Sequence, residues 1–135
     1  MTENILLIKD PNDALLPVEL FDELRNKSFP VISKALIYLQ DKTTIGIIVF
    51  LEIIPDLEIL DFAISPESQN QHYGTELLSE LFCYAKENKF TRLLLEVNEN
   101  NQKALYVYQK AGFQKILERK KYYNDKDTAL VMEKI

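Results

Sequence analysis

The sequence has a single cysteine, Cys83, and contains no long uninterrupted run of apolar residues. One cysteine excludes an intramolecular disulfide and a multi-cysteine metal cluster, so we expect no metal. A membrane-spanning helix needs roughly 18 or more apolar residues in a row, so we expect no membrane span either. Residues 1–9 lack the basic region and the apolar core of a signal peptide, which predicts a cytoplasmic protein.

Positive charge is also scarce. The chain has 16 Lys and Arg residues against 21 Asp and Glu residues, a net charge of −5. A general nucleic-acid binder depends on neutralising phosphates, so this balance argues against a DNA or RNA partner and favours a cationic one, such as an amine. The length of 135 residues with 47% hydrophobic content is typical of one globular domain, which we expect to span residues 1–135.

Hydrophobic periodicity predicts an α/β fold. The expected strands are residues 4–9, 35–40, 45–53, 57–65, 93–97, 113–123 and 128–134, and the expected helices are residues 17–27, 75–86 and 101–111. The order is therefore β-α-βββ-α-β-α-ββ, which indicates a mixed sheet of about seven strands with helices on both faces. The apolar run at residues 93–97 is typical of a strand that is covered on both sides.

A candidate anion site lies where the strand at residues 57–65 gives way to a helix. The segment from Gln69 to Gly74 reads Q-N-Q-H-Y-G. The first N–H groups of a helix have no intrahelical partner, and the helix dipole adds partial positive charge there, so an anion can dock.

A second motif follows the strand at residues 93–97. It comprises Asn101, Ala104, Tyr108 and the pair Gly112-Phe113, and Asn101 is a good helix N-cap. In this order the two motifs resemble the Q/R-x-x-G-x-G/A loop and the N-x-x-A-x-x-x-Y-x-x-x-G-F helix of the GNAT N-acetyltransferase superfamily. The tail, from Arg119 onward, is similar to that of the ribosomal-protein-alanine (RimI-type) branch.

The resemblance implies the GNAT fold, with a twisted, mostly antiparallel sheet, and acetyl-CoA as co-substrate. Main-chain groups of Phe62, Ala63 and Ile64 would bind the pantetheine arm. The loop would cradle the pyrophosphate. His72 stands where the family motif usually has a glycine, so it is expected to take a positive φ at some cost, either as a plain turn residue or with its ring on a phosphate. The cofactor-binding residues implied at the loop and the second motif are Gln69, Asn70, Gln71, His72, Tyr73, Gly74, Thr75, Asn101 and Ala104.

The resemblance also implies the catalytic groups. Tyr108 would protonate the departing thiolate, a role we favour over core packing, which is the other role open to a tyrosine on this helix face. Glu96 interrupts an apolar run, where a carboxylate needs a partner or a purpose, and it is a candidate general base. Glu58 matches the base of another branch of the superfamily and could instead face solvent. Asp61 is expected on the opposite face of its strand from Glu58, or in a structural role.

The acceptor is expected to be a primary amine. Presenting a neutral amine at pH 7 costs about 1.4 kcal/mol for an α-amine and about 4.6 kcal/mol for lysine, which favours a peptide N-terminus. By resemblance, Tyr122 and Tyr123 would line the peptide slot, although both could be ordinary strand aromatics. A small amine or polyamine acceptor, a non-catalytic CoA-binding protein, and either a monomer or a homodimer all stay open.

Overall fold

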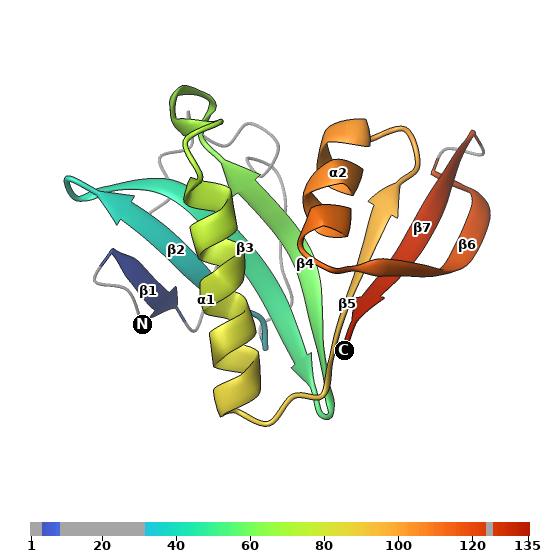
Figure 1. The fold of residues 1–135 in the computed structure, drawn as a ribbon, viewed down its shortest axis with the longest axis horizontal. Helices are drawn as coiled ribbons and strands as arrows, with labels where there is room; N and C mark the ends of the chain where they lie inside the picture. The colour runs from blue at the N-terminus through green and yellow to red at the C-terminus, as the bar shows by residue number, and fades with distance from the viewer. Residues whose placement is uncertain (1–3, 9–31, 124–125) are drawn as a thin grey trace.

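The computed structural model describes residues 4–8, 32–123 and 126–135. Its strands in these ranges are β1 (Ile5–Ile8), β2 (Lys34–Gln40), β3 (Thr43–Ile53), β4 (Asp56–Ile64), β5 (Arg92–Asn98), β6 (Gln114–Tyr123) and β7 (Asp127–Lys134). Its helices there are α1 (Tyr73–Glu87), α2 (Gln102–Lys110) and the short 3₁₀ helix η2 (Pro66–Ser68). The seven described strands form one mixed sheet in the order β1-β2-β3-β4-β5-β7-β6 (Figure 1).

The hairpin between β2 and β3 shows how local sequence sets the sheet. Gln40 pairs with Thr43, so Asp41 and Lys42 form a two-residue loop. Their φ angles are 50° and 66°. Two positive φ angles define the turn whose twist matches that of the flanking strands. The polar pair Asp41-Lys42 is therefore a tight hairpin connection.

The sheet opens between β4 and β5. These two strands pair in parallel only from Asp56 to Ile59, opposite Arg92 to Leu95. Beyond that point β4 continues along β3, whereas β5 continues along β7 as far as Asn98. The two halves of the sheet therefore diverge toward the C-terminal ends of β4 and β5, as the V-shaped outline in Figure 1 shows.

An ion-pair network ties the strands together at the closed end of this V. The Arg92 guanidinium donates to both carboxylate oxygens of Asp56, at 3.2 and 2.9 Å, and to Glu133 Oε1 at 3.3 Å. These contacts join β4, β5 and β7. The hydrogen bonds from Arg92 hold the pKa of Asp56 below its usual range, so the carboxylate stays charged at neutral pH.

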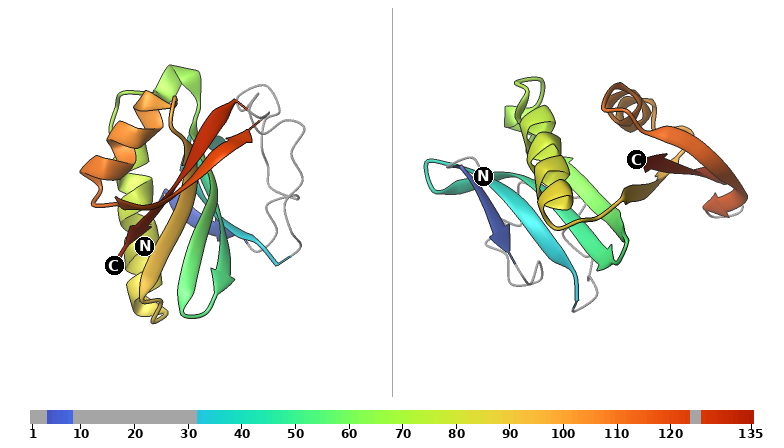
Figure 2. Two further views of the ribbon diagram at one scale, coloured as in Figure 1. Left: turned by 90° about the vertical axis from the view of Figure 1, so that its right-hand side faces the viewer. Right: turned by 60° about the horizontal axis from the view of Figure 1, so that its bottom comes forward.

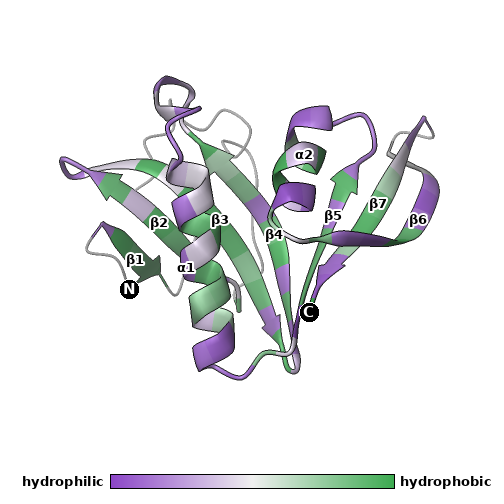
Figure 3. Cartoon of the chain, in the orientation of Figure 1, coloured by the Kyte–Doolittle hydropathy of each residue, from purple (hydrophilic) through white to green (hydrophobic). Residues whose placement is uncertain are grey.

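Both described α-helices pack on the same face of the sheet, as the two side views show (Figure 2). The buried side of α1 consists of Leu77, Leu78, Leu81 and Ala85, and α2 buries Leu105 and Tyr108. These residues join one core cluster with apolar residues of the strands. Hydrophobic residues concentrate along β2 and β3 beneath α1 (Figure 3).

The predicted sheet and the order of its elements are confirmed for the described residues. The helix predicted over residues 17–27 lies outside them. The apolar run in β5 alternates instead of being fully buried: Leu93, Leu95 and Val97 are buried, and Leu94 and Glu96 are half-buried. Within the described part of the chain, no helix has the length and apolarity that crossing a membrane requires.

Candidate active site

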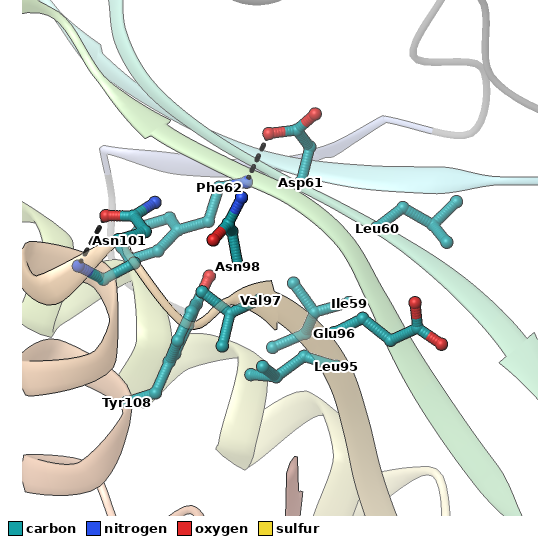
Figure 4. Close-up of a pocket in the computed structure, with 11 residues that line it drawn as sticks. Ile59, Leu60, Asp61, Phe62, Leu95, Glu96, Val97, Asn98, Asn101 and Tyr108 are labelled. Atoms are coloured by element: carbon teal, nitrogen blue, oxygen red, sulfur yellow. Dashed lines mark hydrogen bonds between the residues drawn. The ribbon is translucent and has the colours of Figure 1, made fainter. Parts of the chain in front are cut away.

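A pocket of about 290 Å³ lies where β4 and β5 separate (Figure 4). It is bounded by β4, β5 and α2. Its lining residues are Ile59, Leu60, Asp61, Phe62, Leu95, Glu96, Val97, Asn98, Asn101, Ala104 and Tyr108. The predicted residues Phe62, Glu96, Asn101, Ala104 and Tyr108 are thus brought together, although they come from three different elements.

The β4 wall of the pocket presents backbone groups. The Ser65 N–H donates to the Ile45 carbonyl at 2.8 Å, so at this position the N–H of β4 points toward β3. Successive N–H groups of a strand point to alternate sides, so the N–H of Ala63 also points toward β3. The N–H groups of Phe62 and Ile64 therefore point to the side that β5 has left. Of the three predicted strand residues, these two direct their donors to the cleft.

Asp61 occupies a different position from the one its sequence predicts. A register shift in β4 places Ile59 opposite Phe50 but Asp61 opposite Val49, so one extra residue, Leu60, is inserted. Because a bulge reverses the alternation of side chains, Asp61 lies on the same face as Glu58, which faces Leu51. The prediction of opposite faces was wrong. The Asp61 carboxylate accepts a hydrogen bond from the Phe62 N–H at 3.1 Å (Figure 4).

The predicted loop ends at the N-terminus of α1. His72 is the N-cap and has φ 67°, as predicted for a residue in the usual place of a glycine. The Glu76 N–H donates to the His72 carbonyl at 3.1 Å, the first bond of the helix. The N–H groups of Tyr73, Gly74 and Thr75 precede that bond, as an anion site requires. A Cβ on Gly74 would stand 3.1 Å from Phe62 Cζ, so glycine permits this close approach.

Gln69 links the loop to both walls of the cleft. Its amide nitrogen donates to the Ile64 carbonyl on β4 at 3.1 Å, and its amide oxygen accepts from the Lys103 ammonium on α2 at 2.6 Å. Gln71 donates to the Glu67 carbonyl at 3.2 Å, and Asn70 has φ 64°. These contacts fix the backbone of the loop before any ligand binds.

Tyr108 lies on the helix side of the cleft and is 8% exposed. Its ring contacts those of Phe62 and Phe113, with centroids 6.2 and 5.6 Å apart. Burial raises the pKa of the Tyr108 hydroxyl, and the nearby Asp61 carboxylate raises it further. The hydroxyl is therefore protonated at neutral pH, as a proton donor must be.

The turn before α2 is held by side chains. The Asn101 side-chain oxygen accepts from the Ala104 N–H at 3.1 Å, which confirms the predicted N-cap. Asp127, at the start of β7, accepts from the amides of Asn98 and Asn100 at 3.0 and 2.8 Å. The ends of β5 and β7 therefore fix where α2, the helix that carries Tyr108, begins.

The two candidate bases share one face of the sheet. Glu58 on β4 pairs with Leu94 on β5, and Glu96 lies two residues beyond Leu94 on β5. This face is opposite the one that α1 and α2 cover, since the alternating Leu95 and Val97 pack under the helices. Glu96 forms an ion pair with Arg119 at 3.1 Å. Burial and then the charge of Glu96 raise the pKa of Glu58, while Arg119 opposes the shift.

The residues predicted to line a peptide slot, Tyr122 and Tyr123, end β6, and their side chains lie outside what the structure describes. Lys103 and Arg119 were missed as site residues: each contacts a predicted site residue that is distant in sequence, and no local pattern marks such a contact. Among the described residues, no cluster of His, Cys, Asp and Glu could hold a metal ion.

Comparisons with known proteins bear on this geometry. Residues 6–113 match the model of the acetyltransferase (GNAT) family. The [ribosomal protein bS18]-alanine N-acetyltransferase of Haemophilus influenzae is 31% identical over 98 residues, which cover 70% of this chain and 66% of that protein, just under two thirds of its length.

Two solved structures share the fold. The ribosomal-protein-S18-alanine N-acetyltransferase of Escherichia coli superposes with a TM-score of 0.74 at 21% identity, over 96% of this chain and 92% of that one. A GNAT family acetyltransferase of Elizabethkingia anophelis, solved with acetyl-CoA bound, has a TM-score of 0.77 at 21% identity, over 98% of both chains.

Replacing His72 with glycine should stabilise the protein. A non-glycine residue in the left-handed region costs about 1–2 kcal/mol, which outweighs the entropy that glycine adds to the unfolded chain. We expect the free energy of unfolding to rise by up to about 1 kcal/mol in urea denaturation. Ser79→Gly, at an exposed position inside α1, is the control and should lose about 0.5 kcal/mol. An equal loss in both variants would mean that the imidazole makes a contact the fold needs.

Proposed function

The chain belongs to the acetyltransferase (GNAT) family, and from this membership we propose that it transfers an acetyl group from acetyl-CoA directly to a primary amine, the α-amine of a peptide N-terminus. The observation that carries the proposal is the separation of β4 from β5. It gives a cleft with strand N–H donors on one wall, a helix N-terminus at one end and Tyr108 on the other wall.

The residues of the cleft fit acetyl-CoA. The loop N–H groups of Tyr73, Gly74 and Thr75, with the dipole of α1, suit a diphosphate. The cleft-facing N–H groups of Phe62 and Ile64 suit the amide and carbonyl oxygens of a pantetheine arm, and such donors can stabilise the oxyanion that develops when the thioester is attacked. The bound acetyl-CoA of the related Elizabethkingia anophelis structure supports this assignment.

The proposed chemistry needs one base and one acid. The amine nitrogen attacks the thioester carbonyl, Glu96 accepts the amine proton through a water molecule, and Tyr108 gives its proton to sulfur as the C–S bond breaks. Glu96 is assigned as base because it lines the cleft, whereas Glu58 supports it from the neighbouring strand. The residues that line the described cleft include no cysteine, and Cys83 is exposed on α1, so transfer is assigned without a covalent enzyme intermediate.

The acceptor follows from proton energetics and from similarity. An α-amine costs about 3 kcal/mol less than lysine to present in its neutral form at pH 7. The Haemophilus influenzae relative bears the name of an enzyme that acetylates the alanine of a ribosomal protein. A peptide with a free N-terminus is therefore the proposed class of acceptor.

Turnover of acetyl-CoA should depend on the class of amine. We expect peptides with a free N-terminal alanine to be acetylated with a kcat/KM at least about tenfold above that for N-blocked lysine peptides, given the difference in amine pKa. Release of free thiol measures the rate, and mass spectrometry locates the acetyl group. Turnover with polyamines alone would overturn the peptide assignment, and absence of CoA binding would overturn the whole proposal.

Tyr108→Phe should slow the reaction without loss of cofactor. Removing the proton donor is expected to lower kcat about 10²-fold, while the ring contacts and CoA binding persist. The matched control is Tyr106→Phe, because Tyr106 lies on the same helix but is 65% exposed and outside the cleft. Calorimetry with CoA and steady-state rates separate the two effects. An unchanged kcat in Tyr108→Phe would refute its role as acid.

The two carboxylates can be told apart by substitution. If Glu96 is the base, Glu96→Gln should lower kcat/KM about 10²-fold, and Glu58→Gln should lower it less than about tenfold. The opposite ranking would assign the base to Glu58. Because the pKa of Glu58 is raised, that assignment also requires the acidic fall in kcat/KM to lie at a higher pH than for an ordinary glutamate. Rates measured from pH 5 to pH 9 decide between them.

A further inference from the structure

The first turn of α1 carries a carboxylate of its own, on Glu76. Side chains of a helix lean toward its N-terminus, so a glutamate one turn inside can reach back to the N–H groups there. A carboxylate in that position also interacts favourably with the helix dipole. Glu76 is therefore a potential intramolecular competitor for the site that the proposed function gives to a diphosphate.

A buried tyrosine holds this carboxylate. Tyr38 on β2 is 5% exposed, and its hydroxyl donates to Glu76 Oε2 at 2.7 Å. Its ring packs edge-on against that of Tyr73, with centroids 5.0 Å apart, and the Tyr73 hydroxyl accepts from the Gln40 amide at 3.1 Å. All of these contacts lie on the β2 side of α1, whereas the cleft lies beyond β4.

We propose that Tyr38 is a positioning residue for cofactor binding: its hydroxyl holds the Glu76 carboxylate toward β2 and so leaves the N-terminus of α1 available to the diphosphate of acetyl-CoA. The inference rests on the proposed function. It deepens that function by adding a residue that lies outside the cleft, contacts the loop only through the ring of Tyr73, and acts on the site through the charge of Glu76.

The state of the hydroxyl suits this role. The hydrogen bond to Glu76, with burial, raises the pKa of Tyr38 to about 12, so the group is a donor throughout the neutral range. A hydrogen bond to an ionised acceptor is stronger than one between neutral groups. The carboxylate is therefore held while the rest of the turn, from His72 to Thr75, presents main-chain donors.

The same helix supplies a matched control. Near its other end, the Tyr84 hydroxyl donates to Glu52 Oε2 at 2.8 Å, which again joins α1 to the sheet through a tyrosine and a glutamate. This pair is far along the helix from the loop. Tyr84→Phe therefore removes one hydrogen bond between helix and sheet, while Glu52 keeps its ion pair with Lys34, and it changes no charge near the diphosphate.

The test is CoA binding by calorimetry to the full chain and its variants. Tyr38→Phe should weaken CoA binding about threefold to tenfold, because the released carboxylate competes at the helix N-terminus. Tyr38→Phe with Glu76→Gln should restore affinity to within about twofold of the wild type, although the hydrogen bond is still absent. Tyr84→Phe should bind CoA as the wild type does.

Competition by inorganic diphosphate gives a second readout. The affinity of diphosphate, measured by its competition with CoA, should fall in Tyr38→Phe by the same factor as the affinity of CoA. Glu76→Gln alone should bind CoA as well as or more tightly than the wild type, and this variant keeps the test decisive if Tyr38→Phe does not fold. Weaker CoA binding in Glu76→Gln, or no recovery of affinity in the double variant, would refute the inference. The hydrogen bond between Tyr38 and Glu76 would then have only a structural role. A wild-type chain that binds no CoA would instead refute the proposed function.

Discussion

The unpaired edge of β4 is the constraint on which the site depends. Where β5 turns away after Leu95, the N–H and C=O groups of Phe62 and Ile64 lose their neighbouring strand. Backbone polar groups away from water need partners. Side chains supply partners for two of them: the Asp61 carboxylate accepts from the Phe62 N–H, and the Gln69 amide donates to the Ile64 carbonyl. Both side chains can rotate, so these two edge groups are paired without ligand and can still bind one.

Such an edge is useful only if its spacing from α2 is fixed. The closed end of the V is set by Arg92, which bonds carboxylates of β4 and β7 together. The open end is set by Asp127, which holds the turn into α2, and by the Lys103 bond to Gln69, which spans the cleft. A site built from groups that are already in place loses little entropy when ligand binds. Preorganisation of this kind also accounts for how a loop with a single glycine, Gly74, can present its backbone.

Sequence patterns predicted what short-range physics determines. The strands and the Asn101 cap each follow from a few adjacent residues, and the positive φ of His72 was implied by the family's loop motif. The family that the motifs indicated is confirmed. The bulge at Leu60 does not follow, because it depends on how β4 pairs with β3, and it reversed the expected face of Asp61. The contacts of Glu96 with Arg119 and of Gln69 with Lys103 join residues 23 and 34 positions apart (119 − 96 and 103 − 69), so spacing rules for single helices and strands do not reach them.

The charges around the cleft differ between the two faces of the sheet, and this difference bears on the proposed reaction. The N-terminus of α1 and Lys103 place positive charge on the face that the helices cover, whereas Glu58, Asp61 and Glu96 lie on the opposite face, where Arg119 pairs with Glu96. An anionic cofactor and a cationic amine are attracted to different faces, so each has one favourable orientation. The thioester and the amine then meet between the two, beside Tyr108. In this arrangement a negative charge near the loop would do the most harm, because it would weaken the attraction of the anionic cofactor to its own side. Glu76 is a carboxylate in that position, and the hydrogen bond from Tyr38 keeps it directed toward β2.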